Sequence, residues 1–544
     1  MINIILIYWN TIKYLKNIQI IFRIYYKFKL NYFISRKLIN INKKIKYINL
    51  FSNNNTFFLD DFFHINNQSA DFTKTGWNPN SKDDLWKYKL HYFDYINNSK
   101  KKLKKDIVQM LIYNWIENYP FKSGIGWDPY PTSIRIINWI TWSWNNKFSE
   151  KKVIENLLFQ IRYLSKNIEW HILGNHLATN AKSLIFAGLF FEGNEARKWL
   201  KKGINILEDQ LDEQVLKDGG HFELSPMYHS LFLKDLIEIY NLSKNNKVYF
   251  SKNFNQKLFY KINKMFQWLE LMSHPDGEIG YFNDSVNNEI LKVGELRELA
   301  KYYNIQILNN IELNKIKNLH HLKDSGYINI SAKNFLAIID VGHVGPNYLP
   351  GHAHADTLSF ELSLYNNRFF VNSGISCYGV NKQRHIERST QSHNTVKINN
   401  SNSSNVWASF RVAERAFPQN LSIINENQDF IISCSHNGYK RNYNIIHKRT
   451  WHLSKNKFSI EDEIIGSFKN AFANFILHPE VKIFKLNENS LEFIFCNKKV
   501  KFFSNNKVSL IKKKYNLGFG KSTLTNCILI EFEENKNLTN ILWS

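Results

Sequence analysis

Apolar positions recur with the spacing of an α-helix from about Ser133 to about Ala300. Apolar residues at i, i+3 and i+4 lie on one face of a helix, so such runs predict amphipathic helices. The clearest runs, separated by short breaks with Gly, Asn, Asp or Pro, are IRIINWITWSW, VIENLLFQIRYLSKNI, HLATNAKSLIFAGLFF, MYHSLFLKDLIEIYNL and FYKINKMFQWLELMS. No fixed-length repeat is visible. We therefore expect stacked antiparallel helices in a bundle, a solenoid or an α/α toroid.

The period of the pattern changes after about His320. Segments such as GYINISAKNFLAIIDVG, TLSFELSLYNNRFFVNSG, KFSIEDEII and CILIEFEE alternate or run short and apolar, and Asn, Gly and Ser turns bound them. This pattern predicts a long antiparallel β region, large enough for a sandwich. The predicted boundary lies near residues 310–325, and a cleft between two domains is a usual place for a ligand.

The first 60 residues form a basic, amphipathic segment. Lys13, Lys16 and Arg23 interrupt its apolar run, which makes it too broken to span a bilayer. No signal peptide is readable. The segment can lie on a membrane surface or pack on the body of the protein, and packing is the favoured interpretation. The expected domains are thus residues 1–60, 61–320 and 321–544.

A net charge of +24 over 544 residues favours a polyanionic partner, which can be nucleic acid, anionic lipid or acidic polysaccharide. Codon bias in an AT-rich genome would raise Lys content in the same way. No motif that combines a basic face with stacking aromatic residues is apparent, so we expect no nucleic-acid partner.

Polar residues crowd beside Gly and Pro in GWDPYPTS, which precedes Arg135. Trp127 and Tyr130 are suited to stacking on sugar rings, and Arg135 to binding a carboxylate through two hydrogen bonds. The alternative interpretation is a turn in which Ser133 caps the following helix, and for this cluster alone it is favoured.

Two further clusters carry groups suited to binding anions or moving protons. Asn175 and His176 open a predicted helix, where Asn175 either caps the helix or, with His176, holds an anion at the helix N-terminus. DGGHFELSPMYH places four proton-transfer groups within nine residues, namely His221, Glu223, Tyr228 and His229.

The stretch GHAHAD raises the question of a metal site. On a strand, His352, His354 and Asp356 would project from one face. The pattern partly matches an H-x-H-x-D metallohydrolase signature, but Thr357 stands where a further His is normal, and a helical domain precedes it. A metallohydrolase is therefore a minor alternative.

The order GWDPYPTSIRIINWI, NHLATNAKSLIFAGLFF, DGGHFELSPMYH, HPDGEIGYFNDS, GHAHADTLSFEL and STQSHNTV resembles the heparinase II/III family of polysaccharide lyases. The resemblance covers most of the chain. It implies an α+β multidomain protein with an N-terminal incomplete α/α toroid followed by a C-terminal antiparallel β-sandwich. It also implies β-elimination of a uronate-containing acidic polysaccharide, in which the C5 proton is removed and the 4-linked oxygen is expelled.

The same resemblance implies roles for particular residues. Asn175 matches the position that binds the uronate carboxylate, with His176 as a weaker candidate. Tyr228 matches the tyrosine that donates to the leaving oxygen and, for some sugar stereochemistries, is also the base. His352 matches a base or carboxylate partner. The expected substrate contacts also include Trp127, Tyr130, Arg135, His221, Glu223 and His229.

No cofactor is expected for the chemistry, but part of the family holds a structural zinc. The resemblance implies His354 and His393 as its ligands. The third ligand is an Asp in the family, and this chain has Asn372, a neutral and poorer zinc ligand. Both a structural zinc and no zinc therefore stay open.

The sugar, the oligomeric state and the compartment are not fixed by these observations. The resemblance implies the periplasm or cell envelope, and the lack of a readable signal peptide leaves the cytoplasm as the alternative. The second functional hypothesis is a non-catalytic relative that binds acidic glycans, and the third is the metallohydrolase.

Overall fold

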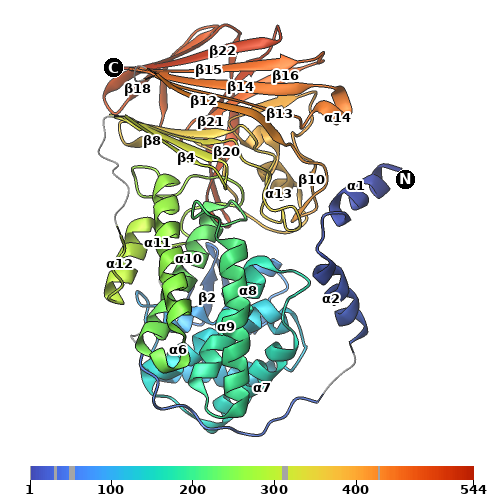
Figure 1. Cartoon of the computed structure of the whole chain (residues 1–544), viewed down its shortest axis with the longest axis vertical. Coiled ribbons are helices and arrows are strands. Elements are labelled where there is room, and N and C mark those ends of the chain that lie inside the picture. The colour runs from blue at the N-terminus through green and yellow to red at the C-terminus, as the bar shows by residue number, and fades with distance from the viewer. Residues whose placement is uncertain (1, 30–32, 48–54, 309–316, 427–428) are drawn as a thin grey trace.

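A computed structural model describes residues 2–29, 33–47, 55–308, 317–426 and 429–544. Figure 1 shows helices in one half of the molecule and sheets in the other. The helical half precedes the β half in the chain, and the expected fold class, an incomplete α/α toroid followed by an antiparallel β-sandwich, is confirmed. Two helices, α1 (Ile2–Ile12) and α2 (Asn17–Phe28), lie along one flank outside both halves.

Apolar periodicity explains the toroid helices. They are α4 (Asp84–Tyr92), α5 (Lys105–Asn118), α6 (Pro129–Asn146), α7 (Lys151–Lys166), α8 (Gly174–Phe190), α9 (Asn194–Gln214), α10 (Pro226–Asn245), α11 (Lys252–Leu271) and α12 (Val293–Tyr302). Every residue of α8 from Leu177 to Phe190 is buried, as expected for a helix that is apolar on most sides. On α9, buried Trp199, Leu200, Ile206 and Leu207 share one face, which packs against α8.

Two helix starts differ from the sequence-based alternatives. α6 begins at Pro129, so Ser133 lies inside the helix and does not cap it; Ser133 Oγ donates to the carbonyl of Pro129 at 2.8 Å. Proline at the first helical position is favourable because its missing N–H would have no partner there. α8 begins at Gly174, so Asn175 lies in the first turn and is not the N-cap residue.

The helical half also contains a small sheet that the sequence pattern did not indicate. Its strands are β1 (Phe57–Leu59), β2 (Phe62–Ile65) and β3 (Gln68–Asp71). Phe63 on β2 is buried and packs on Trp77 and Tyr95. The sheet therefore belongs to the core of the toroid.

The β half begins with β4 (Lys317–Leu322), within the range where the pattern of the sequence changes. In the described part of the chain, one of its sheets has five strands: β4, β5 (Tyr327–Ala332), β6 (Phe335–Asp340), β7 (Phe360–Leu364) and β8 (Asn367–Phe370). A four-stranded sheet contains β9 (Val396–Ile398), β16 (Ala471–Ile476), β20 (Val508–Gly518) and β21 (Lys521–Glu531).

The largest sheet has the order β12-β13-β14-β15-β22-β19-β18-β17 in the described residues. Its strands are β12 (Pro418–Glu426), β13 (Asp429–His436), β14 (Ile446–Ser454), β15 (Lys457–Ile465), β17 (Lys482–Leu486), β18 (Ser490–Phe495), β19 (Lys498–Ser504) and β22 (Lys536–Trp543). On β14, burial alternates from one residue to the next, so the apolar face points into the sandwich core. Two short strands, β10 (Val406–Trp407) and β11 (Arg411–Val412), pair outside these sheets.

Long loops of the β half face the toroid. The loop between β6 and β7 carries GHAHAD, and the segment between β8 and β9 carries α13 (Lys382–Glu387). No helix in the described residues is long and apolar enough to cross a membrane.

Candidate active site

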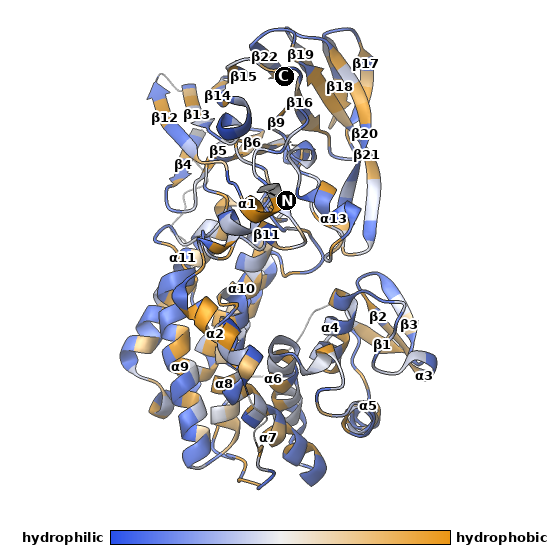
Figure 2. Ribbon diagram, turned by 90° about the vertical axis from the view of Figure 1, so that its right-hand side faces the viewer, coloured by the Kyte–Doolittle hydropathy of each residue, from blue (hydrophilic) through white to orange (hydrophobic). Residues whose placement is uncertain are grey.

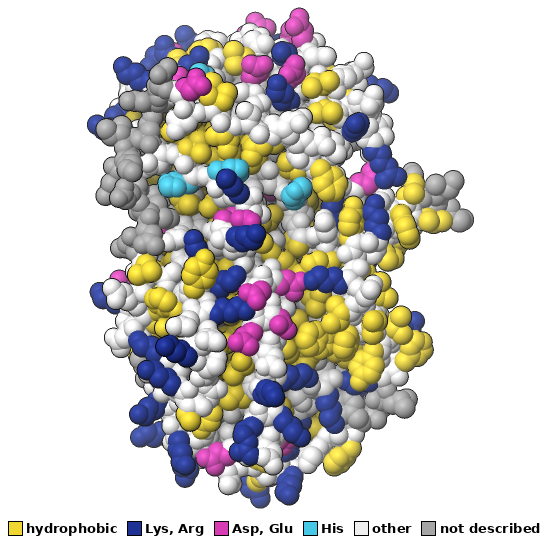
Figure 3. Space-filling model, in the orientation of Figure 1, with side chains coloured by type: hydrophobic (Ala, Val, Ile, Leu, Met, Phe, Trp, Pro, Cys, Tyr) yellow, Lys and Arg dark blue, Asp and Glu magenta, His cyan; other side chains and the backbone are white. Residues whose placement is uncertain are grey.

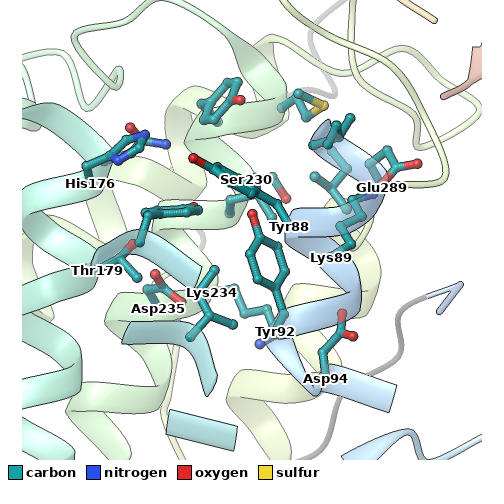
Figure 4. A pocket seen from close by; sticks show the side chains of 18 of the residues that line it. Tyr88, Lys89, Tyr92, Asp94, His176, Thr179, Ser230, Lys234, Asp235 and Glu289 are labelled. Atoms are coloured by element: carbon teal, nitrogen blue, oxygen red, sulfur yellow. Dashed lines mark hydrogen bonds and ion pairs between the residues drawn. The ribbon is translucent and has the colours of Figure 1, made fainter. Parts of the chain in front are cut away.

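A cavity of about 600 Å³ lies between the toroid and the β half. Its toroid walls come from α4, α6, α8 and α10, and its other wall comes from loops that carry His352, Tyr378 and Phe410. Figure 4 shows side chains from several of these elements pointing into one space. Asn175, Tyr228 and His352, which are far apart in the sequence, all line this cavity.

A strained turn presents Asn175 to the cavity. Leu173 and Gly174 have φ values of 72° and 57°, in the left-handed region that non-glycine residues rarely adopt. A Cβ on Gly174 would lie 2.7 Å from Glu223 Oε1, so only glycine allows this approach. The side-chain amide of Asn175 makes no hydrogen bond to any described residue. It is therefore available to a ligand at the positive end of α8.

His176 and Tyr130 form one side of the cavity, and their rings lie 4.3 Å apart between centroids. His176 Nδ1 bonds Glu169 Oε1 at 2.9 Å. Burial alone would lower the pKa of His176, but the Glu169 carboxylate raises it above the ordinary value. These two residues are thus placed where the sequence analysis expected substrate contacts.

Tyr228 and His352 stack on each other, with ring centroids 3.7 Å apart and planes 25° apart. The hydroxyl of Tyr228 lies 2.9 Å from that of Tyr378, a residue that the sequence analysis did not single out. Burial raises the pKa of Tyr228 well above its usual range, so its hydroxyl stays protonated at neutral pH.

Asp284 holds the two histidines of GHAHAD. Its Oδ2 accepts a hydrogen bond from His352 Nδ1 at 2.8 Å, and its Oδ1 bonds His354 Nε2 at 2.8 Å. Both oxygens also accept from the guanidinium of Arg384, at 2.7 Å for Nη2 to Oδ2. Burial alone would raise the pKa of Asp284, but Arg384 and the two imidazoles hold it well below its usual range.

The backbones of the two loops are joined at the same place. The N–H of Asp284 donates to the carbonyl of His352 at 3.0 Å, and the N–H of His354 donates to Asn283 Oδ1 at 3.0 Å. Asp284 lies in HPDGEIGYFNDS, which connects α11 to α12. This motif contributes to the family resemblance, but its aspartate is not among the expected site residues, although an acidic residue in a loop with two glycines was a readable signal.

Glu223 is a buried carboxyl on the cavity wall. Neither of its oxygens has a hydrogen-bond partner of good geometry among the described residues, although the backbone N–H of Asn175 is near enough to lower its pKa. Burial raises its pKa, against the opposing influence of His352, whose Nε2 lies 3.6 Å from Glu223 Oε2. In its protonated form such a carboxyl donates a hydrogen bond.

The lysines of the cavity wall are paired with carboxylates. Lys89 contacts Glu289, and Lys182 contacts both Asp235, at 2.6 Å, and Glu238. Lys234 Nζ lies 2.6 Å from Glu238 Oε1. Figure 4 shows Lys89 beside Glu289 and Lys234 near Asp235. Among the described lining residues there are three lysines, no arginine and five carboxyl residues, so the cavity is not basic although the chain is.

Arg135 and Trp127, two of the expected substrate contacts, do not line the cavity. Arg135 is 0% exposed, does not line the cavity, and donates to Gln160 and to the carbonyls of His91 and Gly126. Its guanidinium lies over the ring of Trp115, 4.1 Å from the centroid. Trp127 is 4% exposed and packs in the same core. Both residues hold the turn before α6, where a substrate does not reach.

His221 and His229, which were also expected to contact the substrate, do not line the cavity, and both are 0% exposed. His221 Nε2 bonds Gln214 at 3.0 Å, and His229 Nε2 bonds the carbonyl of Met265 at 2.9 Å. Burial lowers the pKa of His229 to about 3, so this imidazole is neutral. The two side chains fix the segment that presents Glu223 and Tyr228.

The residues present do not fit the expected structural zinc. His354 Nδ1 and His393 Nε2 lie 3.2 Å apart, but Asn372 Oδ1 accepts the N–H of Asn394. Burial, with Arg384 and Arg388, lowers the pKa of His354 to about 4 against the raising influence of the Asp284 carboxylate, so this imidazole is neutral. Two imidazoles beside the neutral amide of Asn372, whose oxygen already accepts a hydrogen bond, are a poor site for a divalent cation.

The metallohydrolase alternative fails on the same geometry. GHAHAD is a loop and not a strand, and Asp356 Oδ2 accepts the backbone N–H of Asn283 at 3.3 Å. In the part of the chain that the structure describes, no group of three or more His, Cys, Asp or Glu side chains is placed to hold a metal ion.

Family models match both halves of the chain. The model described as "Heparinase II/III N-terminus" matches residues 11–307, and the model described as "Heparinase II/III-like, C-terminal" matches residues 314–544. A heparin-sulfate lyase of Bacteroides stercoris is 28% identical over 313 residues, which cover 55% of this chain and 45% of that protein. A heparin-sulfate lyase of Pedobacter heparinus is 27% identical over 247 residues, or 42% and 36% of the two chains. The chain thus spans less than half the length of these two relatives.

Solved structures show the same fold. A crystal structure of heparinase III superposes with a TM-score of 0.70 at 19% identity, covering 96% of this chain and 89% of that chain. A chondroitinase AC lyase superposes with a TM-score of 0.50 at 9% identity, covering 84% of this chain and 76% of that chain.

The geometry around His354 and His393 predicts that the protein carries no stoichiometric zinc. We expect a chelator to leave the Tm unchanged and metal analysis to find far less than one zinc per chain. The variant Asn372→Asp supplies the missing carboxylate and should raise the zinc content. One zinc per wild-type chain, with a lower Tm after chelation, would contradict this account of the site.

Proposed function

Because the chain belongs to the heparinase II/III family, we propose that it is a polysaccharide lyase that cleaves a uronate-containing acidic polysaccharide by β-elimination. The observation that carries the proposal is the convergence of Asn175, Tyr228 and His352 on one cavity. These residues are 53 and 124 residues apart along the chain, so local geometry does not bring them together.

The first task is to neutralise the uronate carboxylate, since this makes the C5 proton acidic enough to remove. The amide of Asn175, at the N-terminus of α8, donates to that carboxylate in our proposal. In the same proposal Glu223, whose pKa is raised by burial, donates to that carboxylate in its protonated form. Together they stabilise the negative charge that develops on the carboxylate in the transition state.

His352 is the proposed base. Its Nδ1 donates to the ionised Asp284, which leaves Nε2 as the unprotonated nitrogen. Because Nε2 lies 3.6 Å from Glu223 Oε2 on the cavity wall, it points toward the proposed carboxylate subsite. Asp284 acts through His352 and is a positioning residue.

Tyr228 is the proposed acid, because its pKa is raised well above the usual range and its hydroxyl is protonated at neutral pH. His352 takes the C5 proton, the C5–H electron pair forms the C4–C5 double bond, and the C4–O bond breaks. The phenol of Tyr228 protonates the leaving oxygen. No water is added, so the product carries an unsaturated uronate.

The wall charges favour a substrate with few sulfate groups. Each lysine of the cavity wall is already paired with a carboxylate, and Asp94, Asp235, Glu238 and Glu289 would face a bound polymer. A sulfate group would find no unpaired lysine among these described residues, because each lysine already contacts a carboxylate. The proposed substrate is therefore a uronate polymer whose neighbouring sugars are neutral.

The second candidate function is a non-catalytic protein that binds acidic glycans. Two observations favour it: Asn372 stands where the family has an aspartate, and many aromatic residues line the cavity. It predicts glycan binding without a new double bond.

We expect the wild-type protein to release an unsaturated product from an unsulfated uronate polymer and little product from heavily sulfated heparin. The ultraviolet absorbance of the new double bond measures the product. Tyr228→Phe keeps the ring that packs on His352 but removes the proton donor, so kcat should fall by about 10²- to 10⁴-fold. Tyr439→Phe, which alters a buried tyrosine of the β-sandwich that bonds the carbonyl of Val396, is the control and should leave kcat unchanged.

Activity that survives in Tyr228→Phe would rule out the assigned acid. If calorimetry shows that a uronate polymer binds but no such polymer gives an unsaturated product, the protein is a glycan-binding protein and not a lyase.

Asp284→Asn tests the positioning role. It leaves Arg384 buried without a counter-charge, so we expect a lower Tm, from a loss of about 3–5 kcal/mol, and a fall in kcat of about 10²-fold or more. The pKa of Asp284 is lowered in the folded state, so its stabilising effect is present at neutral pH and is lost as the pH falls below about 4. The difference in Tm between Asp284→Asn and the wild type should therefore become smaller below about pH 4 than at neutral pH.

Asp462→Asn is the matched control. Asp462 is also 0% exposed and bonds one arginine and one histidine, Arg449 and His447, within the β-sandwich. Its variant should lose a similar Tm but keep kcat. If Asp284→Asn and Asp462→Asn lose kcat equally, Asp284 has a structural role only and does not position His352.

A further inference from the structure

The two N-terminal helices dock on the body of the protein through polar and aromatic side chains. On α1, Asn10 is 5% exposed, and Trp407 Nε1 donates to Thr11 at 3.1 Å. On α2, Gln19 is 1% exposed, and its Nε2 donates to the carbonyls of Ile172 and Tyr348 at 3.3 and 3.4 Å. Packing on the body, the favoured interpretation of the sequence, therefore combines these polar contacts with ring contacts of Tyr8, Phe22 and Tyr26.

The apolar face of these helices points away from the body. Ile5 and Trp9 on α1 are each 62% exposed. Ile21, Ile24 and Phe28, which share one face of α2, are 60%, 56% and 72% exposed. In Figure 2 both helices are orange on the side that faces the viewer, and Figure 3 shows hydrophobic side chains gathered along that edge of the molecule. An ordinary surface helix turns its apolar face to the core and its polar face to solvent. An exposed apolar face of this kind marks a site where another apolar surface binds.

The charge of the segment indicates what binds this apolar face. The first 59 residues contain no Asp or Glu, and their Lys and Arg residues are Lys13, Lys16, Arg23, Lys27, Lys29, Arg36, Lys37, Lys43, Lys44 and Lys46. Lys13, Arg23 and Lys27 are exposed on or beside the two helices. An apolar helix face bordered only by cations is complementary to anionic headgroups above acyl chains. A second copy of this face would bring like charges together.

We propose that α1 and α2 (hereafter the N-terminal arm) bind the surface of an anionic lipid bilayer. The side chains of Ile21, Ile24 and Phe28 enter the headgroup region, and the basic residues meet lipid phosphates. At 11 and 12 residues, the two helices lie in the interface and do not cross it. The inference is independent of the proposed lyase function.

The test uses the full chain and sedimentation with vesicles. We expect binding to vesicles that contain phosphatidylglycerol, weaker binding at high salt, and little binding to vesicles of pure phosphatidylcholine. The triple variant Ile21→Asp, Ile24→Asp, Phe28→Asp should bind at least about tenfold more weakly, because it removes the apolar contact and adds negative charge. All three positions are exposed, so the variant should keep the wild-type Tm.

A second triple variant is the control: Val248→Asp, Val380→Asp and Leu524→Asp. These residues are 87%, 84% and 65% exposed outside the arm, and their variant should bind vesicles as the wild type does. The proposal is overturned if the wild type does not sediment with anionic vesicles, or if the two triple variants bind equally well. It is also overturned if the arm variant only dissociates a wild-type dimer, measured by light scattering.

Discussion

The junction of the two halves depends on one buried carboxylate. Asp284 comes from the last long loop of the toroid, and its partners, His352, His354 and Arg384, all come from the β half. Without its charge, the guanidinium of Arg384 would be buried and uncompensated. The two carboxylate oxygens of Asp284 bind different histidines of GHAHAD. Oδ2 orients His352 at the cavity wall, and Oδ1 holds the neutral His354 in the interior. The charge balance that joins the halves thus also sets the protonated nitrogen of the proposed base.

Charge is distributed unevenly over the molecule. The chain has a net charge of +24, yet the cavity wall carries more carboxyl groups than lysines. A large share of the positive charge lies in the first 59 residues, which have ten basic and no acidic residues. Net charge is therefore a property of the surface here, and it describes what the protein meets outside the cavity. In our proposal, the cavity recognises its substrate through the polar groups of its wall that have no charged partner, such as the amide of Asn175.

The sequence was informative where a periodic pattern or an ordered set of motifs constrained the fold. The helical spacing predicted the α8 and α10 segments, and the motif order predicted a cavity lined by Asn175, Tyr228 and His352. Polar residues beside Gly and Pro did not reveal exposure, so Arg135 was misjudged: its guanidinium is satisfied by backbone carbonyls that only the folded turn supplies. The pairing of Asp284 with two distant histidines likewise depends on tertiary contacts that no local pattern encodes.

The central claim is that Asp284 fixes the tautomer of His352 and leaves Nε2 free to accept a proton. Nitrogen NMR of protein labelled at histidine, with the His352 signals assigned by their loss in His352→Gln, measures this directly. At neutral pH we expect a proton on Nδ1 of His352 and none on Nε2. A proton found on Nε2, with Nδ1 bare, would contradict it.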